Sequence, residues 1–123
     1  MIDLAFDILT GVVKPAGPVV IKAGAGVPVR LTTSGAPGSL SGLKLGVGSD
    51  KNPPVLLAET GAFVAENATV YTAILDATDA RLVAAIAGKT TAAIAELVAT
   101  LNGVRQVSPN FPVTVQPPIV PLA

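Results

Sequence analysis

The residue types that most often carry catalysis are missing from this chain. Its 123 residues include no His and no Cys. His is the commonest general base and metal ligand, and Cys supplies the thiolate, so neither a Ser–His nor a Cys–His nucleophile pair can form. A zinc site would have to use carboxylates alone, which is unusual. The composition therefore predicts a protein that is not an enzyme and that has no catalytic, cofactor-binding or metal-binding residues.

Acidic side chains are the remaining candidates for chemistry. Asp76 and Asp79 could act as an acid–base pair or hold Ca²⁺, but a calcium site needs about six to eight oxygen ligands and few other donors stand nearby. Acidic residues at the start of a helix cap it and interact favourably with its dipole, and we interpret both aspartates in that way. Glu59 and Glu66 flank a turn that contains Gly61, and we interpret them as a solvated loop face rather than a carboxylate dyad.

Glu96 is placed differently, because it alternates with apolar residues. On a strand it would share one face with Ile94 and Val98. We expect it either to lie at a sheet edge or to meet a positive partner such as Arg105 across a hairpin, where such a pair contributes about 0.2–1 kcal/mol. That role is structural.

Gly88-Lys89-Thr90 matches the end of a phosphate-binding P-loop. The motif also needs Gly five residues earlier, where this chain has Val83. We therefore interpret Gly88 as the end of a helix followed by a turn.

Charge and composition limit the partners of the protein. The net charge is zero, 13% of the residues are charged and 3% are aromatic. Nucleic-acid binding rests on clustered Lys and Arg or on aromatic stacking, so no nucleic-acid partner is expected. Two interpretations of the sparse charge stay open: much of the apolar content is Ala, which fits anywhere, or other subunits cover part of the surface in a homo-oligomer.

Neither end of the chain indicates a membrane. The start, MIDLAFDILTG, lacks a basic region before its apolar stretch, and no run of about 20 apolar residues exists. We expect no signal peptide, no membrane partner and a cytoplasmic origin.

Period-two alternation and Gly/Pro turns predict a chain of short strands. Ile2 to Ile8 alternates clearly, and Thr10-Gly11 and Lys14 to Pro18 then break the pattern. The β-branched runs Val19–Lys22 and Val27–Thr32, separated by Ala-Gly-Ala-Gly, indicate a hairpin or a bulged strand pair. Further strands are expected at 43–47, 55–59, 61–64 and 69–75, with a loop at 49–54.

Asp76 to Ala87 is the one convincing helix, with Asp76 or Thr78 as its cap and Gly88 at its end. Thr91 to Leu101 is ambiguous, since its alanines favour a helix. The Asn102-Gly103 pair that follows is typical of a two-residue hairpin turn, so we predict a strand there, paired with the alternating segment that ends at Val115.

Together these elements predict a mainly β protein: a single Ig-like antiparallel β-sandwich with one short helix near residues 78–87. Phe6, Phe63 and Phe111 are expected to be the largest core side chains. The sandwich domain would span residues 1–116, and residues 117–123 would form a Pro-rich C-terminal arm, either without a role or docked on a neighbour.

Several of these segments resemble small Ig-like β-sandwich domains of tailed-phage virion proteins, of the type found at the N-terminus of baseplate upper proteins. The matching segments are Pro28–Leu31, Leu40–Gly42, Tyr71–Leu75, Ala95–Leu97, Asn102-Gly103, Arg105, Ser108 and Phe111–Val115.

The resemblance implies a structural protein of a phage or prophage particle: a baseplate, tail-fibre or capsid-associated adaptor located in the virion and assembled in the host cytoplasm. Its partners would be other virion proteins and further copies of itself. The alternative is a ligand- or carbohydrate-binding β-sandwich module, although sugar sites normally use aromatic platforms and this chain has one Tyr and three Phe.

Overall fold

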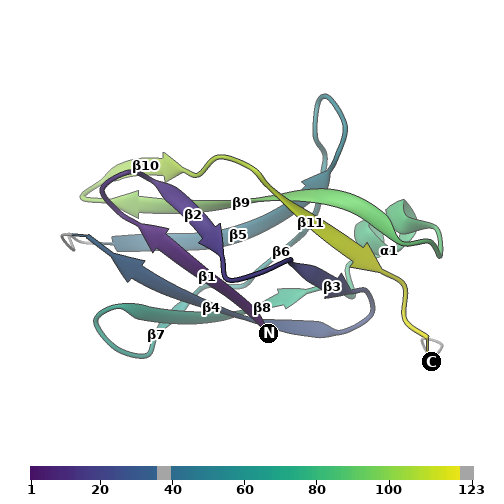
Figure 1. The fold of residues 1–123 in the computed structure, drawn as a ribbon, viewed down its shortest axis with the longest axis horizontal. Helices are drawn as coiled ribbons and strands as arrows, with labels where there is room; N and C mark the ends of the chain where they lie inside the picture. The colour runs from purple at the N-terminus through teal and green to yellow at the C-terminus, as the bar shows by residue number, and fades with distance from the viewer. Residues whose placement is uncertain (36–39, 120–123) are drawn as a thin grey trace.

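The computed structural model describes residues 1–35 and 40–119, and strands dominate this part of the chain (Figure 1). The elements in chain order are β1 (Ile2–Asp7), β2 (Val12–Pro15), β3 (Val20–Lys22), β4 (Gly26–Ser34), β5 (Leu40–Ser49), β6 (Leu56–Glu59), β7 (Val64–Ala65), β8 (Val70–Asp76), α1 (Ala80–Ile86), β9 (Thr91–Leu101), β10 (Val104–Val107) and β11 (Phe111–Gln116).

The strands form two sheets that pack face to face. One sheet has the order β2-β1-β4-β8-β7, and the other has the order β3-β11-β9-β5-β6, with β10 also paired to β9. Most neighbours are antiparallel, whereas β1–β4 and β3–β11 are parallel. The predicted mainly β sandwich with one short helix is confirmed.

The core lies between the sheets and follows from the alternation along each strand. Ile2, Leu4 and Phe6 point inward from β1, while Leu45 and Leu97 do so from β5 and β9. Side chains of successive strand residues point to opposite faces, so each apolar alternation places one row in the core. Two of the three Phe residues behave as predicted: Phe6 and Phe111 are buried. Phe63 is only partly buried and packs against the edge of the core.

Two predictions for the N-terminal third are wrong. The first strand does end before Thr10-Gly11, but Lys14 and Pro15 are not part of the break, because they belong to β2, which pairs with β1. The segments at 19–22 and 27–32 do not form a hairpin either: β3 pairs with β11 in one sheet, and β4 pairs with β1 and β8 in the other. The intervening Ala-Gly-Ala-Gly carries the chain between sheets, which β-branched propensity alone does not reveal.

The ambiguous segment Thr91–Leu101 is a strand along its whole length, as predicted. Asn102 and Gly103 have φ of 51° and 80°, the left-handed values that a two-residue type I′ turn requires. One edge of β9 pairs with β5. Its other edge is shared by β10 and β11 in succession. This strand is therefore the centre of the six-stranded sheet.

The helix is shorter than predicted and has a different cap. α1 begins after Asp79, whose carboxylate accepts a hydrogen bond from Arg81 N–H at 2.9 Å, so neither Asp76 nor Thr78 is the N-cap. The helix ends at Ile86 because Ala87 and Gly88 both adopt the left-handed conformation, with φ of 48° and 73°. Its buried residues, Leu82 and Ile86, close one end of the core.

The last strand ends at Gln116, and the Pro-rich segment follows it. Residues 120–123 of the expected arm lie outside the described residues.

Candidate functional site

Of the two aspartates predicted to cap the helix, only Asp79 does so, and Asp76 instead accepts hydrogen bonds in the turn before it. The Asp76 carboxylate accepts hydrogen bonds from the backbone N–H and the hydroxyl of Thr78. Asp79 caps α1 and accepts two hydrogen bonds from the Arg81 guanidinium, at 3.1 Å from Nε and 2.8 Å from Nη2. These hydrogen bonds lower the pKa of Asp79 from 3.8 to about 2. A carboxylate held in its charged form by an arginine is a poor general base.

Glu59 and Glu66 are not brought together. Glu59 lies on β6 in the six-stranded sheet, where its carboxylate is 3.5 Å from Lys44 Nζ. Glu66 follows β7 in the other sheet, and its N–H donates to Val70 O in the turn toward β8. The interpretation of these two residues as something other than a dyad agrees with this geometry.

Both predicted placements of Glu96 are wrong, because it lies on the central strand β9 and not at a sheet edge, and it does not pair with Arg105. Glu96 does share the outer face of β9 with Ile94 and Val98. On β10, however, Arg105 stands opposite Thr100, four residues away from Glu96 along β9. The tight two-residue turn fixes this register, because each strand residue has one partner at an equal distance from the turn.

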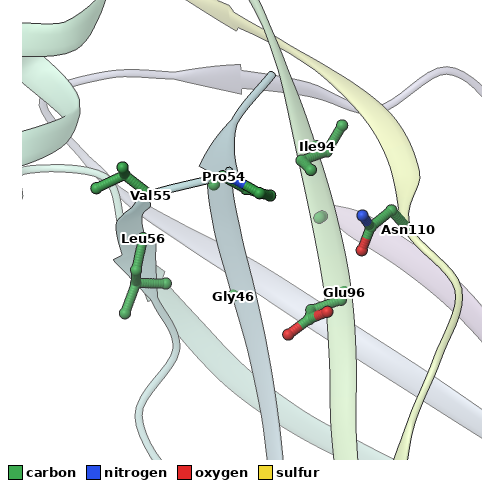
Figure 2. A pocket seen from close by; sticks show the side chains of 9 residues that line it. Gly46, Pro54, Val55, Leu56, Ile94, Glu96 and Asn110 are labelled. Carbon is green, nitrogen blue, oxygen red and sulfur yellow. The ribbon is translucent and has the colours of Figure 1, made fainter. Parts of the chain in front are cut away.

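Glu96 instead lines a shallow cleft on the outer face of the six-stranded sheet. The cleft has a volume of about 270 Å³. Figure 2 shows the Glu96 carboxylate directed across it toward β5. The lining residues come from β5, the β5–β6 connection, β6, β9 and the segment before β11: Gly46, Gly48, Pro54, Val55, Leu56, Ile94, Ala95, Glu96 and Asn110.

Two glycines create this cleft. Gly46 and Gly48 occupy successive outward positions of β5, opposite Glu96 and Ile94 of β9. Because they have no side chains, the sheet surface is hollow there. Leu56 leans over the floor from β6, and its Cδ1 would lie 3.3 Å from a Cβ placed on Gly46. The wall is held by the 49–54 loop, where Ser49 Oγ accepts a hydrogen bond from Val55 N–H at 3.0 Å.

The cleft is mostly apolar and has few polar groups. Its polar side chains are one carboxylate, Glu96, and one amide, Asn110, and the other lining side chains are apolar or absent. Its volume lies below the range of about 300–1,000 Å³ typical of small-molecule sites. The cleft can accept a basic or apolar side chain from a partner, with Glu96 as the hydrogen-bond acceptor. In the sequence, the alternation of Gly46 and Gly48 with Val47 could have indicated this cleft. The same pattern is also typical of a strand bulge, so it was not specific.

The remaining motif is also structural. Lys89 N–H donates to Ile86 O at 2.9 Å, so Gly88-Lys89-Thr90 forms the turn that ends α1 and precedes β9, opposite to the strand–loop–helix order of a P-loop. Among the described residues, no group of three or more acidic residues is placed to hold a metal ion.

Within residues 1–35 and 40–119, no helix has the length and apolar character needed to cross a membrane. Comparison with known proteins gives no match to a protein-family model, a curated protein or a solved structure.

Proposed function

We propose that this chain is a non-enzymatic structural protein of a phage or prophage particle, acting as a baseplate, tail-fibre or capsid-associated adaptor through self-assembly and docking to neighbouring subunits. The segments that resemble Ig-like virion domains, including Asn102-Gly103 and Phe111–Val115, form the turn and the final strand of the β9–β10–β11 unit. Such a unit offers a rigid sheet on which contact surfaces can be built.

The observation that carries the proposal is an exposed apolar depression on the outer face of the five-stranded sheet. Its volume is about 530 Å³. Ile74 on β8 is 55% exposed, Val64 on β7 is 67% exposed and Met1 is 75% exposed, and Pro28 stands directly opposite Ile74 on β4. Glu66 has the one charged side chain among the described residues that line it.

A surface of this kind is costly in water. Each large apolar side chain left exposed forgoes roughly 1.5–3 kcal/mol of burial free energy, and contiguous apolar surface usually marks an interface. The neutral, weakly charged chain offers little electrostatic attraction for a soluble ligand. We therefore assign the depression to an apolar surface of a neighbouring virion protein.

The alternative, a carbohydrate-binding module, has less support. None of the nine described residues that line the Glu96 cleft is aromatic, and the cleft is small. A sugar ring would find no platform on which to stack.

Incorporation into particles tests the proposal. Particles released from the producing culture are purified by density gradient and analysed by mass spectrometry for this chain, with Ile74→Lys as the interface variant. Leu9→Lys is the matched control, because Leu9 is also an exposed apolar residue but lies in the β1–β2 turn. We expect wild type and Leu9→Lys in the particles and a strong loss of Ile74→Lys. Absence of the wild-type chain from purified particles would overturn the proposal.

A further inference from the structure

One strand edge of the six-stranded sheet is open for pairing. β10 binds β9 along one edge, in the register Val104↔Leu101 to Val107↔Val98. Its other edge faces away from β9, and no other strand of the described residues pairs with it. In Figure 1, β10 lies at the end of the sandwich opposite to α1.

The hydrogen-bond phase of β10 identifies the open backbone groups. Ser108 N–H donates to Leu97 O at 2.9 Å, so residue 108 directs its backbone toward β9. In an antiparallel ladder the direction alternates along the strand. Gln106 and Val104 therefore also bond to β9, while Arg105 and Val107 direct their N–H and C=O groups outward.

The other strands at the sheet borders are protected against pairing. β2 carries Lys14 and ends at Pro15, β3 has three residues, and β7 has two. β6 follows Pro53-Pro54 and contacts α1. Short strands, prolines and lysines are the usual means of blocking edge-to-edge pairing. β10, with the sequence Val-Arg-Gln-Val, is also four residues long and carries one basic side chain, but it has no proline and presents Val104 and Val107 exposed.

We propose that β10 pairs antiparallel with β10 of a second copy across a twofold axis, so that the two six-stranded sheets join into one. The inference rests on the self-assembly part of the proposed function and names its surface. A twofold axis makes the same patch serve both copies and closes the assembly at two chains through this contact.

Of the three twofold registers centred on Arg105, Gln106 or Val107, only the one centred on Gln106 satisfies the outward groups. If Arg105 stood opposite Arg105 of the second copy, two like charges would face each other, which destabilises a strand pair. If Val107 stood opposite itself, Arg105 would meet Pro109, which has no N–H to donate. The register with Arg105 opposite Val107 of the second copy avoids both faults and pairs the N–H and C=O of both residues in each copy.

The same register also determines the position of Gln106. It places Gln106 directly opposite Gln106 of the second copy, at a non-hydrogen-bonded position where Cβ atoms approach to about 4.5–5.5 Å. The two amides can hydrogen bond to each other. Arg105 of one copy is only a diagonal neighbour of Arg105 of the other, at about 7–8 Å.

The chain contains no Cys, so single-cysteine variants report this geometry cleanly. Gln106→Cys is incubated at micromolar concentration with a mild oxidant and compared with Arg105→Cys and Lys14→Cys. We expect a disulfide-linked dimer of Gln106→Cys to form at least about tenfold faster than in either control, because only its Cβ atoms approach the spacing that a disulfide needs.

Proline scanning of the edge gives an independent readout. Val107→Pro removes an outward N–H and leaves the ladder between β9 and β10 intact. Analytical ultracentrifugation should show a dimer for wild type and for Val107→Thr, which keeps the N–H and the branched side chain. The Kd of Val107→Pro should rise by at least about tenfold. Circular dichroism establishes that each variant is folded.

Equal cross-linking rates for the three cysteine variants, a dimer unaffected by Val107→Pro, or a strictly monomeric wild type would each overturn the edge pairing. None of these outcomes affects the result of the particle-incorporation test, because that test uses Ile74 on the outer face of the other sheet. Absence of the protein from particles combined with rapid Gln106→Cys cross-linking would instead support the pairing while the proposed function failed.

Discussion

Ser108 and Leu97 are joined by two hydrogen bonds across the six-stranded sheet. Ser108 N–H donates to Leu97 O at 2.9 Å, and Leu97 N–H donates to Ser108 Oγ at 2.9 Å. The hydroxyl thus accepts the bond that a backbone carbonyl accepts in a regular ladder. Pro109 follows, and Ser108 is 6% exposed. The hydroxyl, taking the place of a backbone carbonyl, therefore gives the buried Leu97 N–H an acceptor where the chain passes from β10 to β11.

Removing that hydroxyl should destabilise the protein out of proportion to its size. Ser108→Ala leaves the buried Leu97 N–H without its acceptor, which typically costs about 1–3 kcal/mol of unfolding free energy. Urea denaturation followed by circular dichroism measures the change. Ser41→Ala is the matched control: Ser41 is exposed on β5, and such a substitution should stay within about 0.5 kcal/mol of wild type. Equal stabilities of the two variants would contradict this role for Ser108.

The same arrangement recurs where the chain crosses between the sheets. Thr60 N–H donates to Leu45 O at 2.9 Å, and Leu45 N–H donates to Thr60 Oγ1 at 3.1 Å. Thr60 also forms a bridge with Leu75 of β8, so one residue links both sheets. Its 2% exposure leaves no room for water to replace the hydroxyl.

Thr60→Val should therefore cost more than its nearly unchanged shape suggests. The substitution keeps the branched side chain and removes only the acceptor for Leu45 N–H, so we expect a loss of about 1–3 kcal/mol in unfolding free energy. Thr60→Ser keeps the hydroxyl and loses a methyl group. A thermal melt series with both variants separates the two contributions, and a Thr60→Val melting temperature at or above that of Thr60→Ser would argue against the hydrogen bond.

Local patterns predicted the elements of this fold well, since the information that decides them is local. The alternation in Ile2–Ile8 identified β1, and the turn signal of Asn102-Gly103 identified β9 and its antiparallel pairing with β11, whereas β10, which directly follows the turn, was not predicted as a separate strand. The turn signal also outweighed the helical propensity of the alanines in Thr91–Leu101. Each of these inferences needs only the φ preference of a turn or the period of a strand.

Strand partners and the candidate site were harder to predict from the sequence, because they depend on contacts between distant segments. The pattern of Val19–Lys22 predicts a strand, but nothing within that segment indicates that its partner is β11, a parallel strand about 95 residues later in the chain. Glu96 was recognised as an outward residue, yet its neighbours, Gly46 and Asn110, are set by the register of β9 against β5 and by the path of the chain into β11.

Acid titration should reveal the Asp79–Arg81 interaction. The pKa of Asp79 is lowered to about 2 by hydrogen bonds from Arg81. A carboxylate with a lowered pKa in the folded state stabilises the fold fully above its ordinary value of 3.8, and this contribution is lost as the pH falls from there toward 2. Carboxyl NMR titration should find the midpoint near 2 in wild type and raised toward 3.8 in Arg81→Met, which removes the guanidinium and keeps the backbone N–H of residue 81 as a donor. Equal midpoints would show that the guanidinium does not hold the carboxylate.

The hairpin turn can be tested by a pair of glycine substitutions that differ mainly in backbone conformation. A Cβ on Gly103 or on Gly17 would meet no other atom within 4 Å, so neither Gly→Ala change creates a clash. Gly103 has φ of 80°, whereas Gly17 lies outside the left-handed region. Gly103→Ala should therefore lose about 1–2 kcal/mol of unfolding free energy, the cost of forcing an L-residue into that region.

Gly17→Ala should be neutral or stabilising by up to about 1 kcal/mol, because Ala reduces the entropy of the unfolded chain. Urea titrations of both variants at equal protein concentration give the difference directly. If Gly103→Ala were as stable as Gly17→Ala, the left-handed turn would not be what fixes the register of β9 and β10. The outward placement of Arg105 and Val107 would still stand, because it follows from the hydrogen bond between Ser108 N–H and Leu97 O and not from the turn.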